Sequence, residues 1–116
     1  MGIFRSGKGM ENALKIIREL KEHFKHVTVT DTGKIFNMEL MNVWELGNLL
    51  DLAEMTTVSA IARTESRGGH SREDFPDRDD KNWLKHSLAW VRENGRIDLK
   101  YKPVVLTKYE PKVRTY

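Results

Sequence analysis

Apolar residues recur every three or four positions over residues 10–26, and charged residues fill the positions between them. Lysine, arginine and glutamate fall together on the opposite side when the segment is wound at 3.6 residues per turn. The pattern predicts an amphipathic helix that ends near His26 and buries one stripe. The stripe consists of Met10, Ala13, Leu14, Ile17, Leu20, Phe24 and Val27.

A second helix is predicted over residues 37–66, where apolar residues cover more than one stripe. Asn37 is suited to cap this helix, and Glu39 falls in its first turn. Because a helix that is apolar on several sides is normally enclosed, we expect it to be the central and mostly buried element. Its apolar positions are Leu40, Val43, Trp44, Leu46, Leu49, Leu50, Leu52, Ala53, Met55, Val58, Ala60 and Ile61.

A β-hairpin is predicted over residues 87–101, around the dipeptide Asn94-Gly95 that is typical of tight turns. With a two-residue turn, Glu93 pairs with Arg96, and one largely apolar face results. An isolated hairpin is marginally stable in water, so this face should dock on the helices or on a partner. The expected pairs on it are Leu88 with Tyr101, Trp90 with Leu99 and Arg92 with Ile97.

These elements predict a mainly α fold, namely a small antiparallel helical bundle with a C-terminal β-hairpin and an extended tail. The bundle has two main helices, of which the second is long and central. At 116 residues the chain forms one domain and is too short for a complete two-domain cofactor enzyme. We expect the helices to pack through Leu14, Ile17, Leu20, Phe24, Trp44 and Leu50, with the hairpin covering one end.

Composition and charge narrow the function classes. The chain has no cysteine, which excludes disulfides, thiolate zinc sites and iron–sulfur clusters within it. Residues 99–116 carry five basic residues and one acidic residue, so the net charge of +3 arises in the tail. This basic stretch is short and interrupted by prolines, which does not favour nucleic-acid binding. No apolar run approaches the roughly 18 residues of a membrane span, so we expect no direct membrane insertion.

Candidate cofactor and metal sites find little support in the sequence. Gly7-Lys8-Gly9 follows no predicted strand and has Asn12 where a dinucleotide fingerprint has its third glycine. His23 and His26 could ligate a metal from one helix, but such residues are typical of a solvated last turn. We predict no catalytic, cofactor-binding or metal-binding residue in this chain.

Three aspartates, Asp77, Asp79 and Asp80, are clustered like calcium ligands but lack the glycine and the terminal glutamate of a helix–loop–helix calcium site. Arg72 and Arg78 are nearby in sequence and are expected to pair with them. The whole stretch of residues 63–76 is dense in arginine and acidic residues. Because guanidinium groups prefer carboxylates, phosphates and aromatic faces, it predicts either a buried ion-pair lattice or a docking surface.

The run ARTESRGGHSREDFPDRDDKNWLKHSL, residues 62–88, resembles the C-terminal helical domain of the flavoprotein subunit of succinate dehydrogenase and fumarate reductase. That family has an ESRG-x-H-x-R-x-D-[FY]-P loop, an acidic stretch and then W-x-K-H-[ST]-L. GIFRSGKGMENALKIIRELKEHF, NMELMNVWELGNLLDLAE, YKPV and the terminal KVRTY are also similar, so the resemblance covers residues 3–116. L-aspartate oxidase and adenylylsulfate reductase carry comparable domains. The W-x-K-H-[ST]-L motif, the YKPV strand and the terminal R-[TS]-Y favour the succinate dehydrogenase and fumarate reductase branch.

The resemblance implies FAD in the intact subunit, bound covalently to a histidine of an N-terminal domain, with the dicarboxylate site between that domain and a capping domain. None of those motifs occurs in residues 1–116. We therefore expect a single excised C-terminal domain, with Met1 a cloning start and a further helix preceding it in the family. The chain alone should be inactive. Its expected partners are the flavin-binding and capping domains and the iron–sulfur subunit, in the cytoplasm at the inner face of the cell membrane.

The resemblance also favours the docking interpretation of the charged stretch. We expect the main contact with the rest of the flavoprotein to lie there, with some donors left unpaired in this chain. The alternative function is a free-standing helical module whose basic tail binds an acidic partner or nucleic acid, but such a module has no need of the two motifs quoted first. The interdomain contact candidates are Arg63, Arg67, His70, Arg72 and Asp74.

Overall fold

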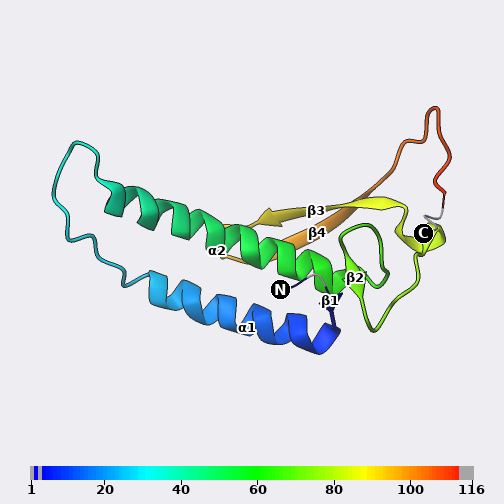
Figure 1. The fold of residues 1–116 in the computed structure, drawn as a ribbon, viewed down its shortest axis with the longest axis horizontal. Helices are drawn as coiled ribbons and strands as arrows, with labels where there is room; N and C mark the ends of the chain where they lie inside the picture. The colour runs from blue at the N-terminus through cyan, green and yellow to red at the C-terminus, as the bar shows by residue number, and fades with distance from the viewer. Residues whose placement is uncertain (1, 3, 113–116) are drawn as a thin grey trace.

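The computed structural model describes residue 2 and residues 4–112, and it shows two long antiparallel helices with a hairpin beside the second (Figure 1). The molecule is elongated, with extents of 55 × 34 × 33 Å. The predicted fold class is confirmed. In chain order the elements are β1 (Phe4–Arg5), α1 (Gly7–Phe24), α2 (Met38–Ala62), β2 (Ser71–Arg72), α3 (Asp80–Trp83), β3 (Lys85–Val91) and β4 (Ile97–Pro103).

Helix α1 begins at Gly7, three residues before the predicted start, because Ser6 caps it. The Ser6 hydroxyl accepts a hydrogen bond from the backbone N–H of Gly9 at 3.2 Å. Met10 is buried, whereas Leu20, which we expected in the contact with α2, is 47% exposed. The stripe is therefore buried best at its N-terminal end.

Helix α2 begins at Met38, as predicted from the Asn37 cap, whose side chain accepts from the N–H of Leu40 at 2.8 Å. It ends at Ala62 and not at residue 66, because Arg63 is extended. This early end releases Arg63 and the residues after it to form the charged loop. No helix in the described part of the chain has the length and apolar character needed to cross a membrane.

The expectation that α2 is mostly buried is wrong for this chain. Only Leu50, Glu54, Thr57 and Ala60 are buried along it, and Trp44 is 70% exposed. The physical reason is that α1 and the hairpin cover α2 from only part of its circumference. A helix with apolar residues on several sides needs more neighbours than these to be enclosed.

The predicted hairpin forms, but its register differs by one residue. The turn contains three residues, because Arg92 pairs with Arg96 and Gly95 takes a left-handed conformation with φ +76°. A slip of one residue turns the side chains of one strand to the other face relative to its partner, and here β3 is the strand that is turned. Leu88 and Trp90, expected on the packed face, therefore point outward and are 37% and 42% exposed.

The face that packs toward α2 is made by the other set of hairpin residues. Ala89 and Leu99 lie opposite each other and are half-buried, whereas Val91, opposite Ile97 beside the turn, is 44% exposed. Beyond Pro103 the chain has no regular structure up to residue 112, in agreement with the extended tail. The terminal KVRTY motif lies, apart from its first lysine, outside the described residues.

Three short elements, β1, β2 and α3, were not predicted, and all three organise the charged loop. Strand β1 pairs with β2 in parallel, with Phe4 opposite Ser71 and Arg5 opposite Arg72. Helix α3 is capped by Asp79, which accepts from the N–H of Asn82 at 3.0 Å. The β1–β2 pair joins the start of α1 to the charged loop that follows α2, and α3 lies at the far end of that loop.

Candidate functional site

The charged loop forms two sets of ion pairs that we call the arginine lattice, and the hydrogen bond from Arg72 to the Arg63 carbonyl joins the two sets. The network lies where α2 ends, at the end of the molecule that also holds β1, β2 and α3 (Figure 1). It contains four of the five predicted contact residues, and the fifth, His70, lies beside it. The lattice consists of Arg63, Glu65, Arg67, Arg72, Asp74, Arg78 and Asp80.

Glu65 is the centre of the lattice and is fully buried. Its carboxylate pairs with Arg63, accepts from Arg67 Nε at 2.9 Å and from the backbone N–H of Asp79 at 2.9 Å. Burial by itself raises the pKa of this carboxyl, but the hydrogen bonds from Arg67, Asp79 and Arg63 outweigh it and leave the pKa below its ordinary value. Sequence reasoning missed Glu65 as a key residue, although a carboxylate between two arginines was a usable signal.

Arg72 closes the C-terminal end of α2 from within the molecule. Its side chain is only 4% exposed, and its Nη1 donates to the carbonyls of Ala60, Ile61 and Arg63 at 3.3, 2.8 and 3.2 Å. The last carbonyls of a helix lack intrahelical donors, and a buried cation at this end also suits the helix dipole. The guanidinium lies 4.8 Å from the centre of the Phe75 ring.

Asp74 joins the lattice to the start of α1. Its carboxylate binds the other edge of the Arg72 guanidinium in a two-point contact and accepts from the N–H of Gly7 at 3.0 Å. The hydrogen bonds from Arg72 and Gly7 hold the pKa of Asp74 far below its usual range. The expected pairing of Arg72 with the downstream aspartates is therefore wrong, because its partner is Asp74.

The outer part of the lattice holds the tail. Asp80 accepts from Arg67 Nη2 at 2.6 Å and from Nε and Nη2 of Arg78, which confirms the pairing expected for Arg78. Arg78 also donates to the carbonyl of Lys112 at 2.7 Å. Hydrogen bonds from Arg78 and Arg67 hold the pKa of Asp80 well below its usual range. The C-terminal segment is thus fixed to the charged loop by one arginine.

The Trp83 motif packs against the inner part of the lattice. The Arg63 guanidinium lies 5.0 Å from the Trp83 ring, and Lys85 Nζ lies 4.5 Å from that ring and 4.3 Å from the Tyr101 ring. Trp83 and Tyr101 meet edge to face at 5.7 Å. Each such cation–π contact is worth about 0.5–2 kcal/mol. The two motifs noted in the sequence are therefore parts of one packed unit.

His70 connects β1 to the end of α2. Its Nδ1 lies 2.8 Å from Arg5 Nη1, and its Nε2 lies 3.1 Å from the carbonyl of Arg63. Burial lowers the pKa of the ring, a hydrogen bond to the Arg63 carbonyl opposes this, and the positive charges of Arg5, Arg72 and Arg63 add to the lowering. His70 is therefore neutral at pH 7.

The expectation that this loop is partly without partners is wrong. Among the described residues, no buried side-chain nitrogen or oxygen lacks a hydrogen-bond partner. Of the two alternatives left open by the sequence, the internal ion-pair lattice is therefore present in this chain. Within the described ranges there is also no group of three or more metal-ligating side chains.

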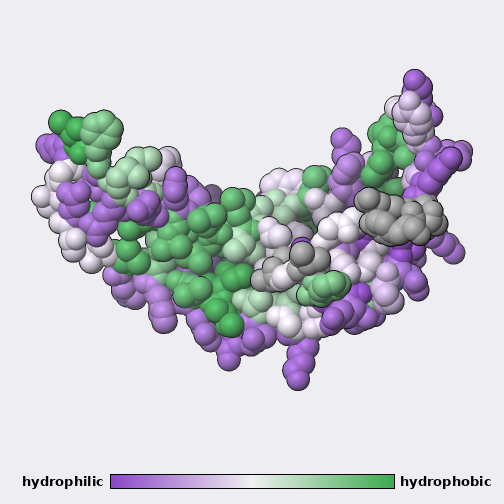
Figure 2. Space-filling model, in the orientation of Figure 1, coloured by the Kyte–Doolittle hydropathy of each residue, from purple (hydrophilic) through white to green (hydrophobic). Residues whose placement is uncertain are grey.

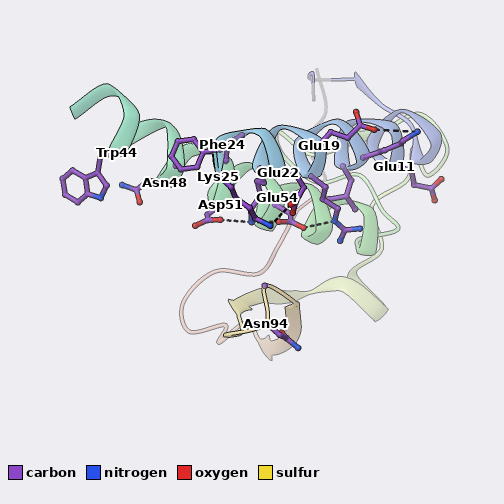
Figure 3. A pocket seen from close by; sticks show the side chains of 17 residues that line it. Glu11, Glu19, Glu22, Phe24, Lys25, Trp44, Asn48, Asp51, Glu54 and Asn94 are labelled. Atoms are coloured by element: carbon purple, nitrogen blue, oxygen red, sulfur yellow. Dashed lines mark hydrogen bonds and ion pairs between the residues drawn. The ribbon is translucent and has the colours of Figure 1, made fainter. Parts of the chain in front are cut away.

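A groove of about 930 Å³ runs between α1 and α2 on the side where the hairpin turn projects (Figure 3). Phe24, Trp44 and Leu50 contribute apolar lining, and Asn94 approaches from the hairpin turn. The wall contains a buried carboxylate, Glu54, which is already paired. Nothing polar in this wall calls for a small charged ligand.

Glu54 is neutralised by two cations of α1. It accepts from Arg18 Nε at 2.9 Å and from Lys21 Nζ at 2.7 Å, and the same lysine binds Asp51 at 2.8 Å. Burial by itself raises the pKa of Glu54, but the hydrogen bonds from Lys21 and Arg18 outweigh this and leave it below its ordinary value. These ion pairs fix the register of α1 against α2.

Beside the groove, one side of α2 is covered by no other element, and we call it the open side of α2. Figure 2 shows apolar residues gathered over the two long helices, while polar residues predominate toward the lattice end. The apolar residues on the open side of α2 span about half of the helix circumference at 3.6 residues per turn. They are Leu40, Met41, Trp44, Leu49 and Leu52, each 49–70% exposed.

Comparisons with known proteins agree with these features. A family model described as fumarate reductase flavoprotein C-term matches residues 1–116. The fumarate reductase flavoprotein subunit of Haemophilus influenzae is 45% identical over 115 residues, and the succinate dehydrogenase flavoprotein subunit of Rickettsia bellii is 44% identical over 112. These matches cover 99% and 97% of this chain but 19% of each relative, so the chain spans about a fifth of their length.

Solved structures show the same relationship in three dimensions. The E. coli quinol fumarate reductase chain superimposes with a TM-score of 0.90 at 42% identity, over 96% of this chain and 19% of that one. A chain of the Mycobacterium smegmatis Sdh1 complex superimposes with a TM-score of 0.75 at 32% identity, over 88% of this chain and 17% of that one. Both similarities extend over nearly all of the present fold.

Proposed function

The chain belongs to the family of fumarate reductase flavoprotein C-terminal domains, and from this we propose that it completes a flavoprotein subunit that interconverts succinate and fumarate. The single observation that supports this is the match over residues 1–116 to about a fifth of each relative. In that enzyme the chain serves as a structural and interaction domain. The free-standing basic module loses its support, because the whole chain matches this one family.

FAD is implied for the intact subunit, but the described residues do not fit a flavin phosphate. The start of α1 is where an anion would bind most naturally. There, Gly9 N–H already binds Ser6 and Gly7 N–H already binds Asp74. A phosphate at that helix end would meet the Asp74 carboxylate. We therefore assign flavin binding to the rest of the flavoprotein and no chemical step to this chain.

The open side of α2 is the surface that we propose to be covered in the intact subunit. Exposed apolar surface of this extent normally marks a contact with another part of a protein. The family resemblance implies a helix upstream of β1, and such a helix is suited to the groove between α1 and α2. The flavin-binding and capping domains would then enclose what remains exposed.

The five candidate residues of the charged loop remain proposed contacts, but only some of them have side-chain surface available for a direct contact. Arg63 and Arg72 are occupied within the domain and are 14% and 4% exposed. Asp74 and Arg67 keep 36% and 28% of their side-chain surface, so a contact with the flavin-binding domain would use these two. His70 would contribute through the local structure that it holds together.

The assembly of the intact subunit is also part of the proposal. The solved relatives include a quinol fumarate reductase and an Sdh1 complex, which supports association with further subunits such as an iron–sulfur protein. We propose a peripheral position at the inner face of the cell membrane, with membrane attachment supplied by other subunits. This chain would reach them only through the rest of the flavoprotein.

The proposal is tested with the complete flavoprotein in two forms, intact and lacking this domain. We expect the truncated form to lose succinate oxidation and to retain less FAD, and the chain alone to purify without flavin. Flavin purifying with the chain alone in a one-to-one ratio, or full turnover by the truncated form, would contradict the proposal.

The contact role of the loop is tested by Arg67→Ala, made in this chain and in the complete flavoprotein. Larger destabilisation in the complete protein supports the interdomain contact. Equal loss in both settings would show that Arg67 acts only inside the domain.

A further inference from the structure

The N-terminal segment, residues 4–7, is held against the charged loop at three points. The backbone N–H of Glu73 donates to the Arg5 carbonyl at 2.8 Å, and Gly7 N–H donates to Asp74 at 3.0 Å. The third point is the contact of the Arg5 guanidinium with His70 Nδ1 at 2.8 Å. These contacts accompany the parallel pairing of β1 with β2, immediately before α1 begins.

The contact between Arg5 and His70 requires one protonation state of the ring. A guanidinium can only donate hydrogen bonds, so Nδ1 must be the acceptor. The proton of the neutral ring is then on Nε2, which donates to the Arg63 carbonyl at 3.1 Å. A protonated ring carries hydrogen on both nitrogens and would place an N–H group against the N–H of Arg5.

The surroundings of His70 also oppose a positive charge on the ring. The positive charges of Arg5 of β1, Arg63 at the end of α2 and Arg72 of β2 all act on it. The lattice carboxylates Glu65 and Asp74 are engaged with arginines. Protonation therefore costs a hydrogen bond and adds a fourth positive charge to the cluster.

We propose that Arg5 and His70 form a pH-sensitive latch that holds the N-terminal segment closed while the ring is neutral and releases it when the ring is protonated. The latch is weakened by acid and not by base, because the pKa of His70 is lowered in the latched state and a released ring therefore binds a proton more readily. The latch is closed above about pH 6.5 and weakens as the pH falls below that value. Asp74 keeps its charge through this range, so its contact with Gly7 does not titrate with the latch.

The latch does not depend on the proposed function, because its parts all lie within this chain. If the proposed function holds, β1 is the stretch through which the preceding part of the flavoprotein joins this domain. Acidification would then loosen that junction while leaving the packing of α1 on α2 intact.

Amide hydrogen exchange of the chain between pH 7 and pH 5 tests the latch. After correction for intrinsic exchange, opening reported by the Glu73 amide should increase by up to about 25-fold from pH 7 to pH 5, the limit for a released ring with a pKa near 6.5. Amides beside Leu50 in the middle of α2 should change less than twofold. A change below twofold at Glu73 would overturn the latch.

Two histidine variants provide the matched comparison. His70→Gln cannot titrate and should remove the pH dependence, whereas His86→Gln, on the exposed face of the hairpin, should retain it. Should His70→Gln fail to fold, nitrogen NMR of the wild-type ring decides the question. A neutral ring with its proton on Nε2 and a depressed pKa supports the latch, and a proton on Nδ1 or titration near 6.5 overturns it.

Discussion

Glu65 and Trp44 are close to opposite ends of α2, and their surroundings differ completely. Glu65 is a carboxylate with no exposed surface and partners on several sides. Trp44 is a large apolar side chain that is 70% exposed beside an open groove. The first residue belongs to the arginine lattice and the second to the open side of α2.

The difference shows which part of the domain can be stable alone and which part needs a neighbour. Charged groups can be removed from water only when partners are positioned for them, so the lattice must be complete within the chain. Apolar residues incur no comparable penalty when one side stays exposed, so α2 can be left open until a larger protein covers it. The charged end is thus internally satisfied, and the apolar side is the better docking surface.

The largest effect is expected for Glu65→Gln, which keeps the shape of the side chain but removes its charge. Three donors, from Arg63, Arg67 and Asp79, would lose a charged acceptor. We expect the free energy of unfolding to fall by about 3–5 kcal/mol, measured by urea denaturation. Glu93→Gln, in the exposed hairpin turn, should change it by less than about 0.5 kcal/mol. A cost below about 1 kcal/mol at Glu65 would mean that the lattice behaves like a surface ion pair.

Leu50→Ala should cost about 2–5 kcal/mol, because Leu50 is 9% exposed in the contact between α1 and α2. The adjacent Leu49 is the matched control, since it is the same residue type in the same helix and is 61% exposed. Leu49→Ala should change the unfolding free energy by about 0.5 kcal/mol or less. Equal costs at the two positions would show that the open side is already covered, for instance by a second copy of the chain.

Acid should destabilise the lattice end before the helix contact. The pKa values of Glu65, Asp74 and Asp80 are lowered in the folded chain, so the unfolded chain takes up protons first as the pH falls. Their contribution is present above about pH 4.3 and is lost below it. Thermal unfolding between pH 7 and pH 2.5 should show a midpoint that decreases by several degrees below pH 4. A midpoint that stays constant through this range would contradict the prediction.

The smallest effect in this chain is expected for Trp44→Ala, with a change of about 0.5 kcal/mol or less. In the complete flavoprotein the same change should cost about 3–5 kcal/mol, as for a buried tryptophan, because the open side is then covered. Trp90→Ala, on the outer face of the hairpin, is a control away from the groove. A cost above 2 kcal/mol for Trp44→Ala in the chain alone would contradict the exposed position.

Local sequence signals determined the helices and the hairpin, because each depends on neighbours in the chain. Asn37 caps α2 where it was predicted to do so, since a cap needs only a side-chain oxygen a few residues from free N–H groups. The apolar stripe of α1 and the Asn94-Gly95 turn were visible for the same reason. The motifs around Arg67 and Trp83 also carried the family resemblance, which the comparisons confirm.

Only the tertiary structure decided the hairpin register and the pairing of the lattice. The hairpin has a three-residue turn in which Gly95 is left-handed, and this register places Trp90 on the outer face. Arg72 pairs with Asp74 and not with the aspartates downstream, and Arg5 contacts His70, which is 65 residues away in the sequence. Such choices depend on which groups meet in space when α1 and α2 pack, and spacing along the chain does not contain that information.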